Sequence, residues 1–192
     1  MAGGDEGDGE HIAILVVCTA NQCRSPLAAV ALQERADAAA LPIRVRSAGV
    51  SAVPGIPATP PTVDAARKLG LDLSEHASVP LDPDDIRAAD LVIGLERRHV
   101  QEIVLRDSHA FGKTFTFKEL ARRGVALGPR APGEPLDAWL ARVHAGRRPI
   151  DLVGASADDD VADPTGSNAV DHRSTAEELD GLSETVLALL FE

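Results

Sequence analysis

Short apolar runs alternate with amphipathic stretches along most of this chain of 192 residues. A continuous apolar run of roughly four to eight residues is typical of a strand that is buried on both faces. Stretches with apolar residues three or four positions apart are typical of helices that cover a sheet. The pattern predicts strands at 11–17, 43–47, 90–95 and 113–117, and helices at 25–36, 62–69, 85–89, 97–105, 118–123, 136–145 and 175–190.

Strands that alternate with helices predict an α/β fold with a parallel sheet. We expect four parallel strands with helices on both faces, which is a three-layer αβα arrangement. The segments 48–61, 125–135 and 151–168 are expected to be loops, and Ser174 or Thr175 to cap the last helix. We interpret residues 11–192 as a single domain and the Gly- and acid-rich residues 1–10 as a disordered tail.

Composition narrows the possible partners and the compartment. The net charge of −11 at pH 7 argues against nucleic acid or an anionic membrane as a partner. No apolar run approaches the roughly 18 residues that cross a membrane. The two cysteines lie five positions apart, which does not form the disulfide framework of a small secreted protein. We therefore expect a cytoplasmic protein whose anionic ligands require a strong local positive site.

The segment 18–25 carries the most specific chemistry of the chain. It follows the first expected strand and precedes the first expected helix, so its backbone N–H groups and the helix dipole favour an anion. Cys18 stands at the strand end, where a thiolate would be stabilised and act as a nucleophile. Arg24 offers a planar guanidinium that can bind two oxygens of a phosphate. The loop therefore predicts phosphoryl chemistry beyond the carboxyl end of the first strand.

Residues 17–26 resemble the signature loop of the low-molecular-weight protein tyrosine phosphatase family, which implies a flavodoxin-like fold. Four further matches lie at Ser47-Ala48-Gly49, Leu73-Ser74-Glu75-His76, Asp90-Leu91-Val92-Ile93 and Asp163-Pro164. The resemblance covers 11–106 and 161–192. Residues 107–160 form a longer region than a typical bacterial member has before the Asp163 loop, and they match weakly.

The resemblance implies a two-step hydrolysis without a metal or an organic cofactor. Cys18 attacks phosphorus and forms a cysteinyl-phosphate, and Arg24 holds the equatorial oxygens in the transition state. Asp163 protonates the leaving oxygen and then activates water as a base. The other groups that bind the phosphate are the loop N–H groups of Thr19, Ala20, Asn21, Gln22, Cys23, Arg24 and Ser25.

The same resemblance assigns supporting roles around this loop. Ser25 donates a hydrogen bond to the Cys18 sulfur, and Ser47 and His76 brace the loop. Asn21 is expected in a left-handed conformation, which Asn tolerates better than most residues. Cys23 has two interpretations: it packs beneath the loop, or it forms a reversible disulfide that protects Cys18 from over-oxidation.

Several residues are better explained by ordinary structural roles. Asp163 competes for the acid role with Asp158, Asp159, Asp160 and Asp171, but an acidic run is usually a solvated loop. His99, His144 and His172 lack metal-ligand spacing and are interpreted as surface residues, and Arg147-Arg148 as a solvated pair. Trp139 is expected to pack in the core rather than to line the substrate pocket. Residues 107–160 could form a lid, a docking surface or a helical decoration.

Departures from the family concern substrate preference. Ala20 stands where the family usually has Gly, which is harmless unless its φ is positive. The aromatic residues that flank phosphotyrosine in the family are replaced by Ala52 and Val53 on one side and by Thr165 and Gly166 on the other. The phosphate cradle is intact, so the sequence predicts a phosphomonoester hydrolase with a weakened reason to prefer phosphotyrosine.

Four alternatives to this function stay open to different degrees. A protein-arginine phosphatase shares the fold, although Gln22 stands where that class has a smaller Thr, and a small-molecule phosphatase is a related option. Thiol-coupled arsenate reduction needs a downstream cysteine pair that the chain lacks after Cys23. A redox-sensing phospho-binding module is disfavoured by the complete set of nucleophile, Arg and acid. The expected ligands are a phosphorylated protein or a small phosphate ester, with inorganic phosphate, sulfate or vanadate bound in the loop.

Overall fold

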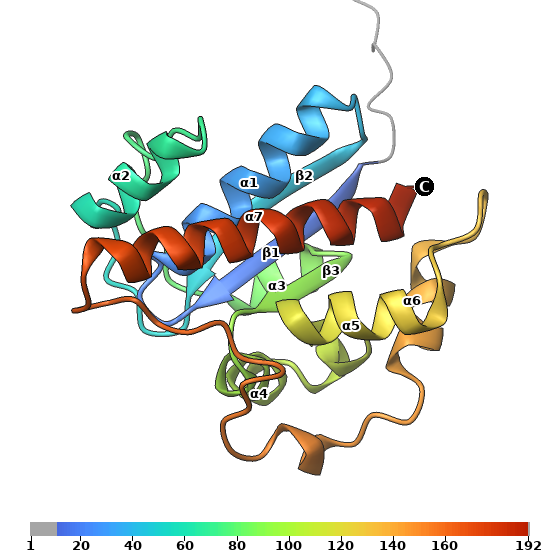
Figure 1. Ribbon diagram of the computed structural model, residues 1–192. Helices are drawn as coiled ribbons and strands as arrows, with labels where there is room; N and C mark the ends of the chain where they lie inside the picture. The colour runs from blue at the N-terminus through green and yellow to red at the C-terminus, as the bar shows by residue number, and fades with distance from the viewer. Residues whose placement is uncertain (1–10, 192) are drawn as a thin grey trace, which may run out of the picture.

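The computed structural model describes residues 11–191, and the predicted tail at residues 1–10 lies outside this range. Within it, the sheet consists of β1 (Ile12–Cys18), β2 (Ile43–Gly49), β3 (Leu91–Gly94) and β4 (Thr114–Thr116). All neighbours pair in parallel, in the order β2-β1-β3-β4. The helices are α1 (Arg24–Ala38), α2 (Pro60–Lys68), α3 (Pro83–Ala88), α4 (Arg97–Arg106), α5 (Phe117–Leu127), α6 (Leu136–His144) and α7 (Ala169–Phe191), with 3-10 turns η1 (Ser108–Lys113) and η2 (Pro149–Leu152) (Figure 1).

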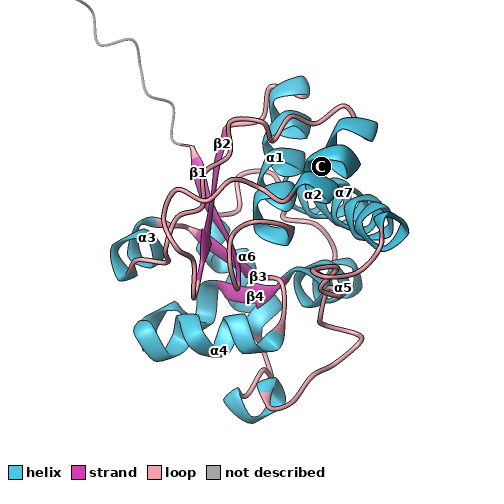
Figure 2. Cartoon of the chain, turned by 90° about the vertical axis from the view of Figure 1, so that its left-hand side faces the viewer, coloured by secondary structure: helices cyan, strands magenta, loops and turns pink. Residues whose placement is uncertain are grey.

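Helices cover both faces of the sheet, as the alternating pattern predicts (Figure 2). Alternate side chains of β1 point to opposite faces, because successive residues of a strand do so. Ile14 and Val16 pack in a cluster with residues of α1, α2, α5, α6 and α7. Leu15 and Val17 pack with Ile86 of α3 and residues of α4 and η1. The three-layer αβα prediction is confirmed.

The carboxyl ends of three strands meet where residues 18–25 leave the sheet. Cys18 pairs with Gly49 of β2, and Val17 pairs with Gly94 of β3. A Cβ atom on Gly49 would lie 2.7 Å from the Thr19 oxygen and 2.9 Å from the Asn21 nitrogen. Gly49 is therefore required by close approach of the loop backbone, which explains the glycine of the Ser-Ala-Gly segment physically.

Two helix boundaries differ from the sequence prediction by four residues or more. Helix α5 continues to Leu127 and ends at Gly128, whose φ of 98° suits glycine, so the loop expected from residue 125 begins later. Helix α7 begins at Ala169 rather than at 175. Asn168 Oδ1 accepts the N–H of Val170 at 2.8 Å, which makes Asn168 the capping residue. The prediction of Ser174 or Thr175 as the cap was wrong because the first turns of α7 are polar.

The region 107–160 supplies the edge strand β4 and contributes to the core. Trp139 is fully buried, and its Nε1 donates to the Gly128 oxygen at 3.2 Å. Trp139 therefore packs in the core as predicted and does not line the phosphate loop.

Arg147 was predicted to be half of a solvated pair, and this was wrong. Its guanidinium makes two hydrogen bonds to Glu119, at 2.7 and 2.9 Å, and stacks 4.2 Å from the Phe115 ring centre. The pair and the ring together remove the Arg147 side chain from solvent, while Arg148 stays exposed. No helix within residues 11–191 has the length and apolar character needed to span a membrane.

Candidate active site

The Cys18 sulfur lies at the N-terminal end of α1, inside the loop 18–25. Its Sγ is 3.0 Å from Ser25 Oγ and accepts the N–H of Asn21 at 3.3 Å. Both contacts stabilise negative charge on sulfur, and the helix dipole acts in the same direction. The loop, here called the phosphate loop, therefore holds the Cys18 thiol, the candidate nucleophile, where an anion is favoured.

Asn21 organises the phosphate loop from its centre. Its φ of 54° lies in the left-handed region, as predicted, and Ala20 does not have a positive φ. Asn21 Nδ2 donates to Ser25 Oγ at 2.8 Å and to Ser47 Oγ at 2.9 Å. Its backbone oxygen accepts from His76 Nε2 at 2.7 Å. The structure thus brings Ser47 and His76 to the loop, each bonded to a different group of the same fully buried residue.

Arg24 is buried and shared between two carboxylates. It forms ion pairs with Glu96 and, at 2.7 Å, with Asp163 Oδ2. Its Nη1 also donates to the Val161 oxygen at 2.9 Å. The sequence motifs do not indicate Glu96, although its position two residues after β3 places it beside the carboxyl end of β1. Burial opposes ionisation of Glu96, but hydrogen bonds from Arg98 and Arg24 outweigh it and lower its pKa.

Asp163 is the one member of its acidic segment that reaches Arg24. Burial opposes ionisation of its carboxyl, but the hydrogen bond from Thr165 and the charge of Arg24 outweigh it and lower its pKa. Thr165 N donates to Asp163 Oδ1 at 3.1 Å, which fixes the second oxygen. Asp159 and Asp160 instead bind residues of α4 and α5, and Asp171 lies exposed in the first turn of α7.

The interpretation of three histidines as surface residues was wrong for His99 and His172. His99 is fully buried, and its Nε2 lies 3.0 Å from Thr19 Oγ1 in the phosphate loop. Burial lowers the pKa of His99 from 6.5 to about 4, so the ring is neutral. His172 is buried with its Nδ1 3.3 Å from Thr62 Oγ1. His144 is only partly exposed, with its ring centre 4.7 Å from that of Phe111.

A spacing in the sequence could have found His99. It follows Glu96, the residue before α4, by three positions, and both side chains contact the phosphate loop, at Thr19 and Arg24. His172 offers no such signal, because the polar start of α7 does not look like a buried helix face.

Cys23 packs beneath the phosphate loop. Its thiol is buried, accepts a hydrogen bond from Thr62 Oγ1 at 3.0 Å and lies 3.8 Å from His172 Nδ1. Burial raises the pKa of Cys23 to about 11, so this thiol is protonated and a poor nucleophile. Both cysteines are free, and the reversible disulfide with Cys18 stays a prediction.

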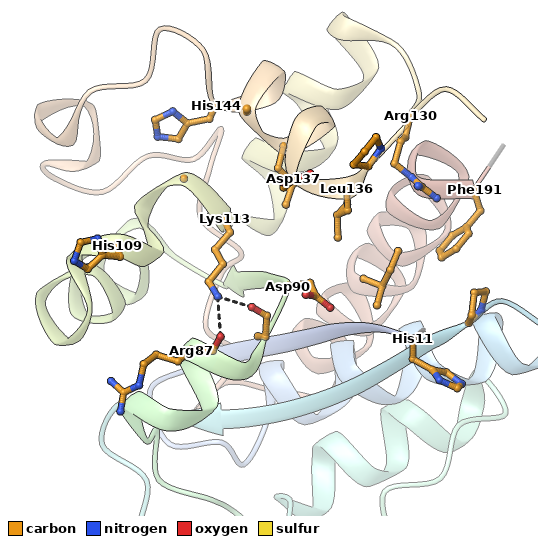
Figure 3. A pocket seen from close by; sticks show the side chains of 17 residues that line it. His11, Arg87, Asp90, His109, Lys113, Arg130, Leu136, Asp137, His144 and Phe191 are labelled. Atoms are coloured by element: carbon orange, nitrogen blue, oxygen red, sulfur yellow. Dashed lines mark hydrogen bonds between the residues drawn. The ribbon is translucent and has the colours of Figure 1, made fainter. Parts of the chain in front are cut away.

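A pocket away from the phosphate loop lies at the opposite end of the sheet, where the strands begin. It has a volume of about 1040 Å³ and is lined by residues that precede the strands, including His11, Asp90 and Lys113 (Figure 3). Lys113 Nζ donates to the backbone oxygens of Arg87 and Ala89, so its charge is already engaged. Chemistry rather than pocket size therefore locates the site at the phosphate loop. Within residues 11–191, no cluster of three or more His, Cys, Asp or Glu has a metal-binding arrangement.

Comparison with known proteins agrees with this geometry. Residues 13–124 match the profile of the family described as low molecular weight phosphotyrosine protein phosphatase. The chain belongs to this family. The matched range contains the phosphate loop, Ser47, His76 and Glu96, and it runs past residue 106, where the resemblance was expected to weaken. It ends before Asp163.

Individual members of the phosphatase family extend the comparison. A probable low molecular weight protein-tyrosine-phosphatase, EpsP, of Ralstonia nicotianae is 35% identical over 144 residues, which cover 69% of this chain and 96% of that protein. A protein-arginine-phosphatase of Bacillus subtilis is 40% identical over 106 residues, which cover 55% of this chain and 70% of that protein. The crystal structure of the low molecular weight protein tyrosine phosphatase from T. tengcongensis superposes with a TM-score of 0.70 at 29% identity, covering 92% of this chain and 97% of that one.

Proposed function

We propose that this protein is a cysteine-dependent phosphomonoester hydrolase that works through a cysteinyl-phosphate. The observation that carries the proposal is the Cys18 sulfur, which lies 3.0 Å from Ser25 Oγ at the helix terminus that also presents Arg24. Membership of a phosphatase family supports the same chemistry. The two free cysteines agree with action in a reducing compartment such as the cytoplasm.

In the first step, the Cys18 thiolate attacks phosphorus as the bond to the leaving oxygen breaks. Asp163 gives its proton to that oxygen, so the product leaves as an alcohol or phenol. The loop N–H groups and Arg24 stabilise the charge on the three equatorial oxygens. The product of this step is a thiophosphate ester on Cys18.

In the second step, water attacks phosphorus and the sulfur–phosphorus bond breaks. Asp163, now ionised, accepts a proton from the water, which restores the acid for the next cycle. Ser25 Oγ donates to the departing sulfur, which leaves as a thiolate. Inorganic phosphate is released, and no oxidant or reductant is consumed.

Replacement of the nucleophile tests this proposal. Cys18→Ser is expected to abolish hydrolysis of p-nitrophenyl phosphate, because a serine hydroxyl in this loop is not ionised. Binding of inorganic phosphate, measured by calorimetry, is expected to persist, because the loop N–H groups and Arg24 remain. Turnover by the Cys18→Ser variant close to that of the wild-type protein would exclude Cys18 as the nucleophile.

The substrates are phosphorylated proteins or phosphate esters, and two observations bear on which phosphorylated residue is preferred. Val53, where the family has an aromatic side chain, is 61% exposed, so the rim on this side is aliphatic. The loss of each aromatic pair removes about 0.5–1.5 kcal/mol of stacking with a phenol ring. The 40% identity with a protein-arginine-phosphatase favours phosphoarginine as the second candidate.

A comparison of phosphopeptides separates the two candidates. We expect kcat/KM for a phosphotyrosine peptide to exceed that for a phosphoarginine peptide, because Gln22 places a longer side chain in the loop than the Thr of the arginine-specific class. The Gln22→Thr variant is expected to bring kcat/KM for the two peptides closer together. A wild-type preference for the phosphoarginine peptide would instead make this protein a protein-arginine phosphatase.

A further inference from the structure

Two carboxylates of the acidic run 158–160 point into the molecule rather than into solvent. Asp159 is 5% exposed and accepts hydrogen bonds from Arg97 Nε at 2.8 Å and from Arg122 Nη2 at 2.7 Å. Asp160 Oδ1 accepts the backbone N–H of Arg97 at 2.7 Å, and its Oδ2 accepts that of Ser156 at 2.8 Å. The sequence predicts a solvated loop here, so the buried arrangement requires an explanation.

Val161, the next residue, also binds the segment that follows β3. The N–H of Val161 donates to the Leu95 oxygen at 2.8 Å, and its side chain is fully buried. Its own carbonyl oxygen accepts from Arg24 Nη1 at 2.9 Å. Asp160 and Val161 therefore bind the backbone of the β3–α4 junction, residues 94–97. Asp163, the proposed acid, follows Val161 by two residues.

This junction also supports the phosphate loop. Glu96 lies between Leu95 and Arg97 and forms the ion pair with Arg24. The phosphate-binding guanidinium and the segment that carries the acid are thus attached to the same few residues. A displacement of the segment from the junction would change the distance between Asp163 and any phosphate held by Arg24.

The charges explain why the attachment is tight. Asp159 joins two arginines from different helices, Arg97 of α4 and Arg122 of α5. A buried carboxylate without a partner is costly, so loss of these bonds drives the segment outward. Burial opposes ionisation of Asp159, yet hydrogen bonds from Arg122 and Arg97 outweigh it and lower its pKa. The lowered pKa favours the charged carboxylate that both ion pairs require.

We propose that Asp159 and Asp160 are positioning residues, which hold the acid segment on the β3–α4 junction so that Asp163 reaches the leaving oxygen. They do not contact the phosphate. This inference rests on the proposed hydrolase function and adds to it the device that places the acid. A misplacement of about 1 Å in such a group can cost about 10²-fold in rate.

A leaving-group comparison tests the positioning role. Phenol, with a pKa of about 10 like that of Tyr, needs a proton to leave, whereas p-nitrophenolate leaves readily without one. We expect Asp159→Asn and Asp160→Asn each to lower kcat/KM for phenyl phosphate by about tenfold or more. In both variants, kcat/KM for p-nitrophenyl phosphate should change little. Asp163→Asn sets the upper limit of the loss in kcat/KM for phenyl phosphate, since general acids contribute about 10²–10⁴-fold to the rate.

Asp158→Asn is the matched control, because this exposed neighbour loses the same charge. This variant should leave kcat/KM for both substrates unchanged. Competitive inhibition by inorganic phosphate should be unchanged in all the Asn variants at 158–160, since the phosphate loop is intact. Equal losses on the two substrates in Asp159→Asn and Asp160→Asn would overturn the inference, because a general loss of structure affects both.

A second variant covers the case in which Asp159→Asn does not fold. Arg122→Gln removes one partner of Asp159 from a side chain that is 56% exposed, so the core is untouched. Arg122→Gln should also lower the ratio of kcat/KM for phenyl phosphate to kcat/KM for p-nitrophenyl phosphate. An unchanged ratio would exclude Asp159 as a positioning residue. If the wild-type protein hydrolyses neither ester, the proposed function itself fails. If it hydrolyses both and the variants match Asp158→Asn, only the positioning role fails.

Discussion

At the scale of single residues, His99 supports the phosphate loop in an uncharged form. Its Nε2 contacts Thr19 Oγ1, and its buried Nδ1 has no hydrogen-bond partner in the part of the chain that the structure describes. A positive charge at this position would carry an N–H without an acceptor in a fully buried site. The ring is therefore a neutral hydrogen-bonding group whose protonation opposes folding.

This burial predicts how stability depends on pH. The unfolded chain binds a proton at His99 below pH 6.5, whereas the folded protein does so only below about 4. Between these values the unfolded state holds more protons, so the free energy of unfolding falls as the pH is lowered from 6.5 toward 4. The shift corresponds to on the order of 3 kcal/mol.

Urea unfolding at pH 7 and pH 5 measures this effect. The His99→Gln variant does not titrate in this range and should lose less stability between the two pH values than the wild-type protein does. His109→Gln is the control, because His109 is exposed, and its pH dependence should match that of the wild type. Equal pH dependence in His99→Gln and wild type would show that His99 is not held neutral by the fold.

At the scale of elements, the ends of β1, β2 and β3 carry different parts of the site. The end of β1 provides Cys18, and the end of β2 provides Ser47 and Gly49. The β3–α4 junction provides Glu96, and the first turn of α4 provides His99. Each part follows a strand because parallel strands end at one edge of a sheet. The carboxyl ends of the parallel strands therefore bring the parts of the site together around the phosphate loop.

Gly49 gives a test at this scale. Gly49→Ala would place a methyl group 2.7 Å from the Thr19 oxygen and 2.9 Å from the Asn21 nitrogen, which are backbone atoms that cannot rotate away. The loop must move, so kcat/KM for p-nitrophenyl phosphate should fall by about 10–100-fold. Gly112→Ala, which meets nothing within 4 Å, should leave activity unchanged. Wild-type activity in Gly49→Ala would show that the loop tolerates displacement from β2.

At the scale of the whole molecule, the sequence predicted the fold better than the site. The strands and their order of appearance follow from apolar periodicity, and the phosphate loop from its place between a strand and a helix. Glu96 and His172 were missed because their roles depend on contacts between elements that are far apart in sequence, whereas His99 is indicated only by its spacing from Glu96. The acidic run 158–160 was interpreted as solvated because composition does not reveal Arg97 and Arg122 opposite it.

The packing of the region 107–160 also could not be predicted from the sequence alone. Its helices α5 and α6 were predicted, yet their packing against the core through Trp139 and Leu140 depends on the sheet edge at β4. Helix α7 lies beside α1 and α5, so the last part of the chain closes the face that holds the larger core cluster (Figure 1). Helices α5 and α6 thus extend the larger core cluster beyond the sheet.

The sharing of Arg24 between Glu96 and Asp163 has a consequence for the order of events in a catalytic cycle. The positive charge of Arg24 helps to keep Asp163 ionised, and an ionised carboxyl cannot act as an acid. A phosphate dianion that occupies Arg24 takes up this charge and adds its own negative charge beside Asp163, which raises the pKa of the carboxyl. In the proposed cycle, Asp163 is therefore protonated more readily while a phosphate occupies the loop than when the loop is free. Protonation of the proposed acid and occupancy of the loop are thus coupled.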